Sequence, residues 1–421
     1  MSNKILFIAA FILAIPLFCK AEEISLTLDE AVTLALRDNR AVLLKVEDVK
    51  KAKYGINEAQ AALYPTLNAT GAWFYNRGLF NKDVGVYTAI VGVRQILYTG
   101  GKVVNALKVS EYAYESAQAV LDQTKQDTVY MVKASYYTLL LSRHLAALNK
   151  TMLENTQEHA RFIQARYGSG QASASETLNM KSALSSMQQA YDSARGQAET
   201  AQEVLRNLLY LDTGVMIAPS TQFKYEQQEL AYDKAFIKAM QARPEIRQVE
   251  AQRKIFSHSL EAAKAGNRPT ISAAWDYFYR SSALTDASHN PNDYNAVGII
   301  VSWPVFDGWL TKSKVAKAIV DVKQGELTRE KLLKDIVLDV KTAYVALSDA
   351  IEKMKSIEDQ VFVYKDTVQV MQKKFNDGIA SSLDVHDAML AYDISIFNQT
   401  QALYDYLTAK AAFDKATGGV L

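Results

Sequence analysis

Residues 132–139, VKASYYTL, recur 208 positions later as residues 340–347, VKTAYVAL. The stretch YPTL at 64–67 likewise recurs as RPTI at 268–271, 204 positions later. Four residues therefore enter the second copy between these two landmarks. A unit of about 200 residues is too long for a solenoid repeat, so the pattern predicts a whole supersecondary assembly that has been duplicated in tandem.

The duplication divides the chain into repeat 1 at 22–229 and repeat 2 at 230–421. The preceding residues, 1–21, are predicted to be a secretory signal. Lys4 is followed by an apolar run over 5–18, and residues 19–21 have small side chains at the two positions that a signal peptidase recognises. That run is shorter than the ~20 apolar residues of a membrane-spanning helix. Lipid attachment at Cys19 is the other alternative, but the bulky Phe18 stands where a small residue is expected.

Cys19 is the only cysteine, so the predicted mature chain has neither disulfides nor thiolate metal sites. The chain carries 47 basic and 46 acidic residues, a balance that offers no general affinity for nucleic acid. After residue 21 the sequence has no apolar stretch of the length that a transmembrane helix needs. If the protein crosses a membrane, we expect it to do so with strands.

Each repeat is predicted to begin with a helix, at 28–63 and at 232–265. Thr27 and Glu30 have the spacing of a capping box at the start of the first. Pro65 and Pro269 end these helices, because proline biases the residue before it away from helical geometry.

Directly after each proline the apolar period changes to two, which predicts strands at 66–76, 86–98, 270–280 and 294–306. A soluble antiparallel sheet would show the same alternation. The apolar face is bordered by tryptophan and tyrosine, however, and each strand has about the ten residues that the wall of an outer-membrane barrel requires. We therefore favour a membrane barrel.

Long helices are predicted after each hairpin, at 102–167 and 310–375, because these stretches have no proline and almost no glycine. Return helices follow at 175–211 and 383–415, and the segments 212–229 and 416–421 are expected to lie near the middle of the rods. The second rod carries apolar residues at coiled-coil spacing. They are Ile336, Val340, Tyr344, Leu347, Ile351, Met354, Ile357 and Val361.

The order of these features resembles the TolC-type outer-membrane efflux proteins over essentially the whole predicted mature chain. The residues that carry the resemblance are LTLDEAV at 26–32, the two strand-starting prolines, the strand exits YTGG at 98–101 and FDG at 306–308, and the turns at Gly170 and Gly378. The resemblance implies a mainly α protein with a membrane β-barrel. Three copies would give four strands each to one twelve-stranded barrel, continuous with a long periplasmic α-helical coiled-coil barrel.

The same resemblance implies an exit duct in the outer membrane of a Gram-negative bacterium, serving a tripartite efflux or type I secretion system. Its partners would be itself as a homotrimer, a periplasmic adaptor protein, an inner-membrane pump or ABC transporter, and outer-membrane lipid. The strands independently require an oligomer, since four cannot close a barrel and an open sheet edge leaves amides unpaired in lipid. The strand count alone permits two or three copies.

The sequence does not indicate an enzyme, a cofactor or a bound metal. The five histidines are not paired at metal-ligand spacing, and there is no phosphate-binding or dinucleotide fingerprint. The ten methionines are scattered along the sequence, which gives little support to a copper site.

The polar cluster after the second long helix is the candidate periplasmic gate. Asp384 and Asp387 are three residues apart and so share a helix face. The resemblance implies that both face inward and ring the entrance, although a pair of solvated surface aspartates is the alternative. Gly170 and Gly378 mark the helix-tip turns where the adaptor would dock.

The resemblance also assigns Phe375 and Glu176 to the gate. Some members of the family have a latching arginine after the turn glycine, where this chain has Ala380, and Phe375 lacks the hydroxyl of a latch tyrosine. Glu176 matches the acidic partner of that latch. We therefore predict a closed state held by packing more than by ion pairs. If His386 faces the tunnel, its protonation near pH 6 would offset the charge of the two aspartates, and a histidine on the helix surface is the alternative.

The alternative function is an exported trimeric coiled-coil adhesin or scaffold with no transport role. It accounts for the rods but leaves the aromatic-bordered hairpins unexplained. The sequence does not identify the transported substrate, the particular adaptor and pump, or whether the resting channel is open or closed.

Overall fold

The computed structural model describes residues 23–79, 82–221, 225, 231–281, 292–380 and 382–419. It divides into two compact units. The first combines the described residues up to Ala35 with Val132–Tyr225 and Ile357–Tyr404, and the second holds the remaining described segments. Each unit contains parts of both repeats, so the duplicated halves are not separate domains.

The opening helix of each repeat is broken in two, and the prediction of single helices at 28–63 and 232–265 is wrong. Repeat 1 has α1 (Leu28–Asp38) and α2 (Arg40–Ala61), with extended backbone at Asn39, whose side chain accepts a hydrogen bond from the Ala41 amide. Repeat 2 has α5 (Tyr232–Ala242) and α6 (Pro244–Lys264), with Arg243 extended in front of Pro244. An asparagine cap and a proline in the first turn are both strong signals for a new helix. A short 3-10 turn, η1 (Ala265–Asn267), follows α6.

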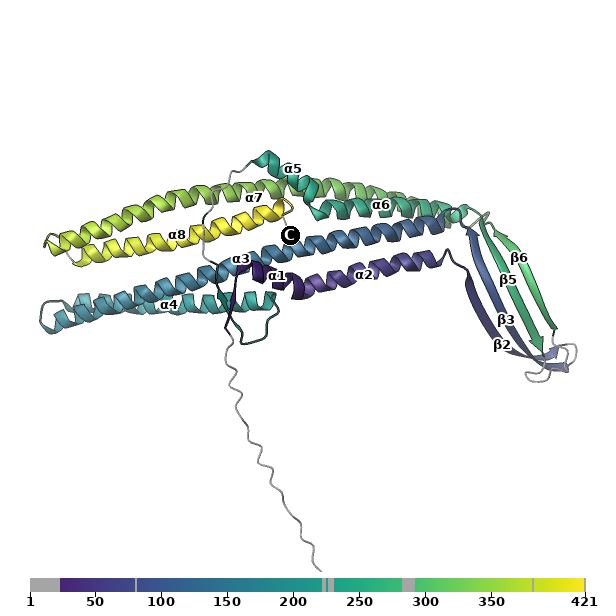
Figure 1. The fold of residues 1–421 in the computed structure, drawn as a ribbon, viewed down its shortest axis with the longest axis horizontal. Coiled ribbons are helices and arrows are strands. Elements are labelled where there is room, and N and C mark those ends of the chain that lie inside the picture. The colour runs from purple at the N-terminus through teal and green to yellow at the C-terminus, as the bar shows by residue number, and fades with distance from the viewer. Residues whose placement is uncertain are drawn as a thin grey trace, which may run out of the picture. The chain divides into compact units, whose positions relative to one another are not determined.

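Four strands form one antiparallel sheet in the order β2-β3-β5-β6, as Figure 1 shows. They are β2 (Thr66–Leu79), β3 (Lys82–Tyr98), β5 (Thr270–Ser281) and β6 (Asn292–Ser302). The last strand ends at residue 302, not at 306 as expected, and Pro304 just beyond it has no amide hydrogen for a ladder bond. The connection between β5 and β6, residues 282–291, lies outside the described residues.

The pairing register places the alternating apolar residues that the sequence predicted, such as Leu67 and Val297, on the same face of the sheet. Val93 lies opposite Trp275, which in turn lies opposite Val297. This face is widely exposed in the single chain, with Val297 81% exposed. Its other exposed residues include Leu67, Trp73, Tyr75, Ile299 and Val301. The opposite face, termed the polar face, carries Asn68, Thr70, Thr88 and Asp276 together with the apolar Phe74, Ile90, Phe278 and Tyr294.

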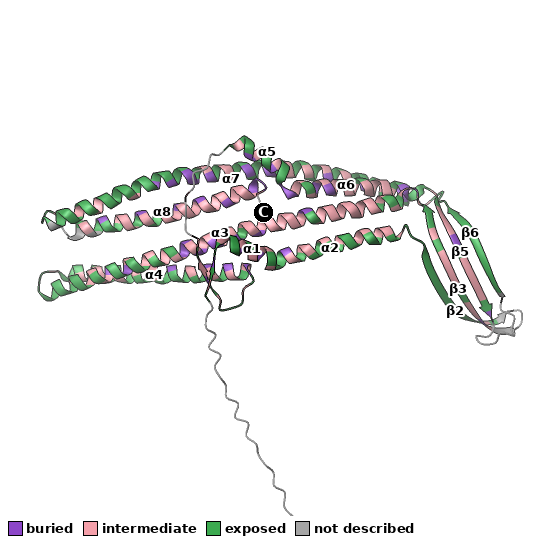
Figure 2. Ribbon diagram, viewed as in Figure 1, coloured by how far each residue is buried: buried purple, intermediate pink, exposed green. Residues whose placement is uncertain are grey.

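The two edge strands, β2 and β6, are each paired on one side only within the described sheet. Figure 2 shows them mostly exposed, whereas β3 and β5 between them are mostly half-buried. Each edge therefore presents a row of backbone groups that can pair with another strand.

The long helices of the two repeats match in length and position. α3 (Lys102–Gly168) and α7 (Leu310–Asn376) have 67 residues each, which corresponds to roughly 100 Å. The return helices α4 (Ala174–Leu208) and α8 (Ser382–Ala416) have 35 residues each. Among the described residues, no helix is both long and apolar enough to cross a membrane.

The return helix of repeat 1 ends at Leu208 and not at 211. Tyr210 has a φ of 55°, in the left-handed region, and the Leu211 amide donates back to the Arg206 carbonyl. This arrangement terminates a helix by satisfying its last carbonyls.

In α7, the residues of the predicted coiled-coil seam are buried, apart from the half-buried Tyr344 and Val361.

A pair of short strands was not predicted. β1 (Glu23–Leu26) runs parallel to β4 (Met216–Pro219), and β4 falls within 212–229, the segment expected to lie near the middle of the rods. The strands join a buried cluster that connects α1, α3 and α4. Its fully buried members include Val132, Tyr136, Leu139, Leu205, Leu209 and Ile217.

Candidate functional site

The turns that follow α3 and α7 have the same geometry. Gly170 has a φ of 75° and Gly378 a φ of 72°. In the first turn the Gly170 amide donates to the Tyr167 carbonyl and the Gln171 amide donates to Arg166. In the second turn Gly378 donates to Phe375, and Ile379 donates to Lys374. A left-handed residue completes this helix ending, and glycine adopts that conformation without steric cost.

Asp384 and Asp387 lie at the beginning of α8, just past the second turn, and both are exposed. A helix N-terminus carries partial positive charge from its free amides, which favours carboxylates there. Phe375 is 44% exposed in the single chain, so its ring is available to a neighbouring surface. The side chain of His386 lies outside the described part of the chain, so its predicted pH role stays a prediction.

Glu176 has a local role at the start of α4. Its carboxylate accepts a 2.6 Å hydrogen bond from the Ser173 amide, and the Ser173 hydroxyl accepts from the Glu176 amide at 3.1 Å. This reciprocal pair is a capping box. The hydrogen bonds from the Ser173 backbone and side chain hold the pKa of Glu176 below its ordinary value. The predicted contribution of Glu176 to a gate remains a prediction.

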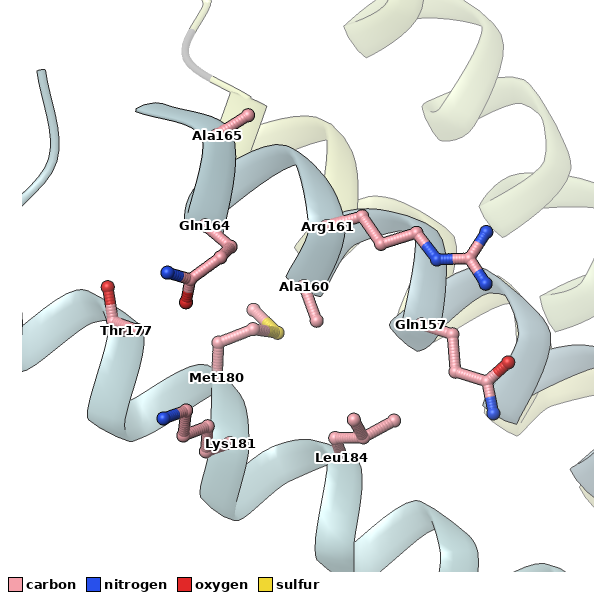
Figure 3. Close-up of a pocket in the computed structure, with 9 residues that line it drawn as sticks. All are labelled: Gln157, Ala160, Arg161, Gln164, Ala165, Thr177, Met180, Lys181 and Leu184. Atoms are coloured by element: carbon pink, nitrogen blue, oxygen red, sulfur yellow. The ribbon is translucent and has the colours of Figure 1, made fainter. Parts of the chain in front are cut away.

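A groove between α3 and α4 lies close to the first turn, and sequence reasoning missed it. Its volume is about 760 Å³. Figure 3 shows Met180 and Leu184 of α4 extending toward α3, which contributes Ala160 and Arg161. The remaining lining residues are Gln157, Gln164, Ala165, Thr177 and Lys181. The groove is thus apolar at its centre, with two cationic side chains in its lining.

A second cavity gathers methionines that are far apart in the sequence. Four of the chain's ten methionines, Met152, Met180, Met187 and Met389, line a space of about 190 Å³. The expectation that the methionines are scattered therefore holds along the chain but not in space. Within the described ranges, no group of three or more histidine, cysteine, aspartate or glutamate residues could hold a metal ion.

Comparison with known proteins finds relatives over most of the chain. The family model described as "Outer membrane efflux protein" matches the chain twice, over residues 31–209 and 237–419. The probable efflux pump outer membrane protein TtgC of Pseudomonas putida is 25% identical, over 91% of this chain and 80% of that protein. The outer membrane efflux protein BepC of Brucella suis is 22% identical, over 99% of this chain and 90% of that protein.

Solved structures show the same fold at lower identity. The CmeC outer membrane channel of Campylobacter jejuni superposes with a TM-score of 0.84 and 15% identity, covering 93% of this chain and 85% of that one. The outer membrane protein VceC of Vibrio cholerae gives a TM-score of 0.79 and 14% identity, covering 93% and 96%.

Proposed function

Because the chain belongs to the outer membrane efflux protein family, we propose that three copies of it form one exit duct through the outer membrane of a Gram-negative bacterium. The duct performs no chemistry. It conducts substrate passively to the exterior from a periplasmic adaptor and an inner-membrane pump or ABC transporter. The adhesin or scaffold alternative is set aside, since the family match covers both repeats.

The observation that carries this proposal is the four-stranded sheet with one exposed apolar face and two free edges. Lipid tolerates strands only where every backbone group is paired, so the edges of neighbouring copies must pair. Two copies would supply eight strands, and side chains fill the interior of a barrel of about that size. Twelve strands from three copies leave room for a lumen, which the polar face with Thr70, Thr88 and Asp276 would line.

The gate of this duct is assigned to the tip of the second coiled coil. Three copies would bring Asp384 and Asp387 into a ring of carboxylates, a constriction that favours cations. Packing of Phe375 against the neighbouring copy would hold the closed state. The exposure of all three side chains in the single chain supports this assignment.

The adaptor is proposed to dock at the turns around Gly170 and Gly378 and along the groove of Figure 3. An adaptor segment with an apolar ridge and flanking acidic side chains would complement Met180, Leu184, Arg161 and Lys181. Cysteines placed at Ser169 and Ile379 would cross-link the adaptor in cells, because both positions are exposed in the turns.

The oligomer is tested by cross-linking between sheet edges. A Thr70→Cys/Gly298→Cys double variant places one thiol on each edge strand, on the polar face, and a bifunctional reagent should link chains into a ladder that ends at the trimer. The control, Ile90→Cys/Phe278→Cys, places thiols on the inner strands at directly opposed positions, so it should link only within one chain. A ladder that continues past the trimer, or edge links confined to monomers, would contradict the closed trimer.

The gate is tested in planar bilayers under a salt gradient. The Asp384→Asn/Asp387→Asn variant should lose cation preference and shift the reversal potential toward zero. Asp366→Asn, which neutralises an exposed carboxylate within α7, is the control and should leave the potential unchanged. Equal shifts in both variants would show that general surface charge sets the selectivity.

A further inference from the structure

We propose that Met152, Met180, Met187 and Met389 form a binding site for a soft monovalent cation, Cu(I) or Ag(I). The four side chains come from α3, α4 and α8 and line one cavity of about 190 Å³. Met180 and Met187 are seven residues apart on α4, two helical turns, and so face the same direction. The site is separate from the sheet and from the carboxylates at the tip.

The donor set determines the ligand class. Thioether sulfurs are soft, neutral donors that favour Cu(I) over hard cations such as Mg²⁺ or Ca²⁺. The same wall carries polar groups from Asn155, Ser186 and Asp393. A carboxylate in the lining adds negative charge next to an otherwise uncharged set of ligands, which raises the local concentration of cations. The volume exceeds the roughly 30 Å³ share of one water molecule in the liquid, so an ion fits without displacing a helix.

The accessibility of the site also fits an exchangeable ion. Met389 is 45% exposed, and Met152, Met180 and Met187 are half-buried. An ion can therefore enter from solvent at Met389 and be coordinated by the other three thioethers. A site closed on all sides would not exchange on the time scale of transport.

Methionine also fills irregular gaps in cores, so packing is the competing explanation. The duplication argues against it. At the offset of 208, the positions equivalent to Met152, Met180 and Met187 hold Gln360, Ala388 and Ser395, and Met389 corresponds to Lys181. The second repeat forms the same pair of helices with the same lengths without methionine at the three positions equivalent to Met152, Met180 and Met187, and α4 forms without methionine at the position equivalent to Met389. The fold therefore does not require methionine at these positions.

The experiment measures Ag(I) binding to the full-length protein in detergent by equilibrium dialysis and elemental analysis. The wild-type protein should bind about one Ag(I) per chain. Met180→Leu/Met187→Leu should weaken the affinity for Ag(I) by at least tenfold, since mutations around a bound metal typically lower its affinity by about 10- to 100-fold. Leucine nearly conserves the volume of methionine, so a packing role would survive this change. An excess of Mg²⁺ should not displace the silver.

The matched control is Met131→Leu/Met216→Leu, which removes two methionines that are 44% and 43% exposed and do not line the cavity. It should bind Ag(I) like the wild type. An equal loss in both double variants, or no loss in either, would overturn the site. If the cluster variant fails to fold, NMR of the wild-type protein with labelled methionine methyl groups provides the test. The methyl signals of the four cavity methionines should shift together when Ag(I) is added. A uniform response of all methionines would overturn the proposal. Neither readout depends on the trimeric duct.

Discussion

The hydroxyl of Tyr136 donates a 2.8 Å hydrogen bond to the backbone carbonyl of Leu26, 110 residues earlier in the chain. The same oxygen accepts a 3.2 Å bond from the Thr221 amide. One buried side chain on α3 therefore ties both the N-terminal strand β1 and the end of β4 to the coiled coil of the first unit.

Removal of this hydroxyl should loosen the strand pair locally. In Tyr136→Phe the Thr221 amide loses its partner, at a cost of about 1–2 kcal/mol. Amide hydrogen exchange over 23–26 and 216–221 should accelerate roughly 5- to 30-fold, while exchange in the sheet stays unchanged. Tyr344→Phe at the equivalent position of repeat 2 is the control, because the ring contacts of Tyr344 with Tyr232 and Lys341 survive the change. Equal acceleration in the two variants would contradict the assignment.

The two glycines near the first turn should respond oppositely to alanine. Gly170 has a left-handed φ, so Gly170→Ala should destabilise the turn by about 1–2 kcal/mol. Gly168 is the last residue of α3 and has open space around it, so Gly168→Ala should be neutral or stabilising by up to about 1 kcal/mol. Proteolysis at the turn, measured for both variants, should rise only in Gly170→Ala.

Charge placed on the two faces of β6 should have different effects on assembly. Val297→Lys puts an ammonium on the apolar face opposite Trp275, which costs about 2–4 kcal/mol near the middle of the bilayer. Ala296→Lys puts the same charge on the polar face, opposite Asp276. The yield of the proposed trimer in outer-membrane fractions, measured by heat-modifiable gel migration, should fall only for Val297→Lys. Loss of trimer in both variants would mean that the two faces are not lipid and lumen.

The start of α4 should depend on pH through Glu176. The pKa of Glu176 is lower in the folded state, so its stabilising contribution is complete above the ordinary glutamate pKa of about 4.3 and is lost as pH falls through the folded value. Hydrogen exchange at 173–177, corrected for the intrinsic rate, should therefore rise on acidification from pH 6 toward pH 3. Glu176→Gln keeps an uncharged acceptor and should show a flat profile. A rise of the same size in the glutamine variant would assign the effect to another group.

Much of this fold follows from local patterns. Alternation after Pro65 and Pro269 gives the two faces of each hairpin, and the absence of proline gives the long helices. The breaks at Asn39 and Pro244 were missed although both residues signal a helix start, because the apolar stripe continues through them. The pairing of Leu26 with Pro219 has no local signal, because a strand of four residues is too short for an alternation of apolar and polar residues to be recognised.

The candidate sites divide in the same way. The turn glycines and the Ser173–Glu176 capping box are visible as short motifs. The groove of Figure 3 and the methionine cavity have no such motif in the sequence. In the cavity, Met152 and Met389 are separated by more than half of the chain and come together only through the packing of three helices. Clusters of this kind depend on tertiary structure and not on spacing.

α3 and α7 are equal in length, and so are α4 and α8. This equality restricts how the length of the helical rods can change during evolution. One residue inserted into α7 would rotate everything beyond it by about 100° and move the seam residues away from their partners. A longer rod therefore requires additions of seven residues, about 10 Å, made in all four helices together. The distance that this protein bridges in the cell envelope can be expected to differ among its descendants in discrete steps, and intermediate lengths should be rare.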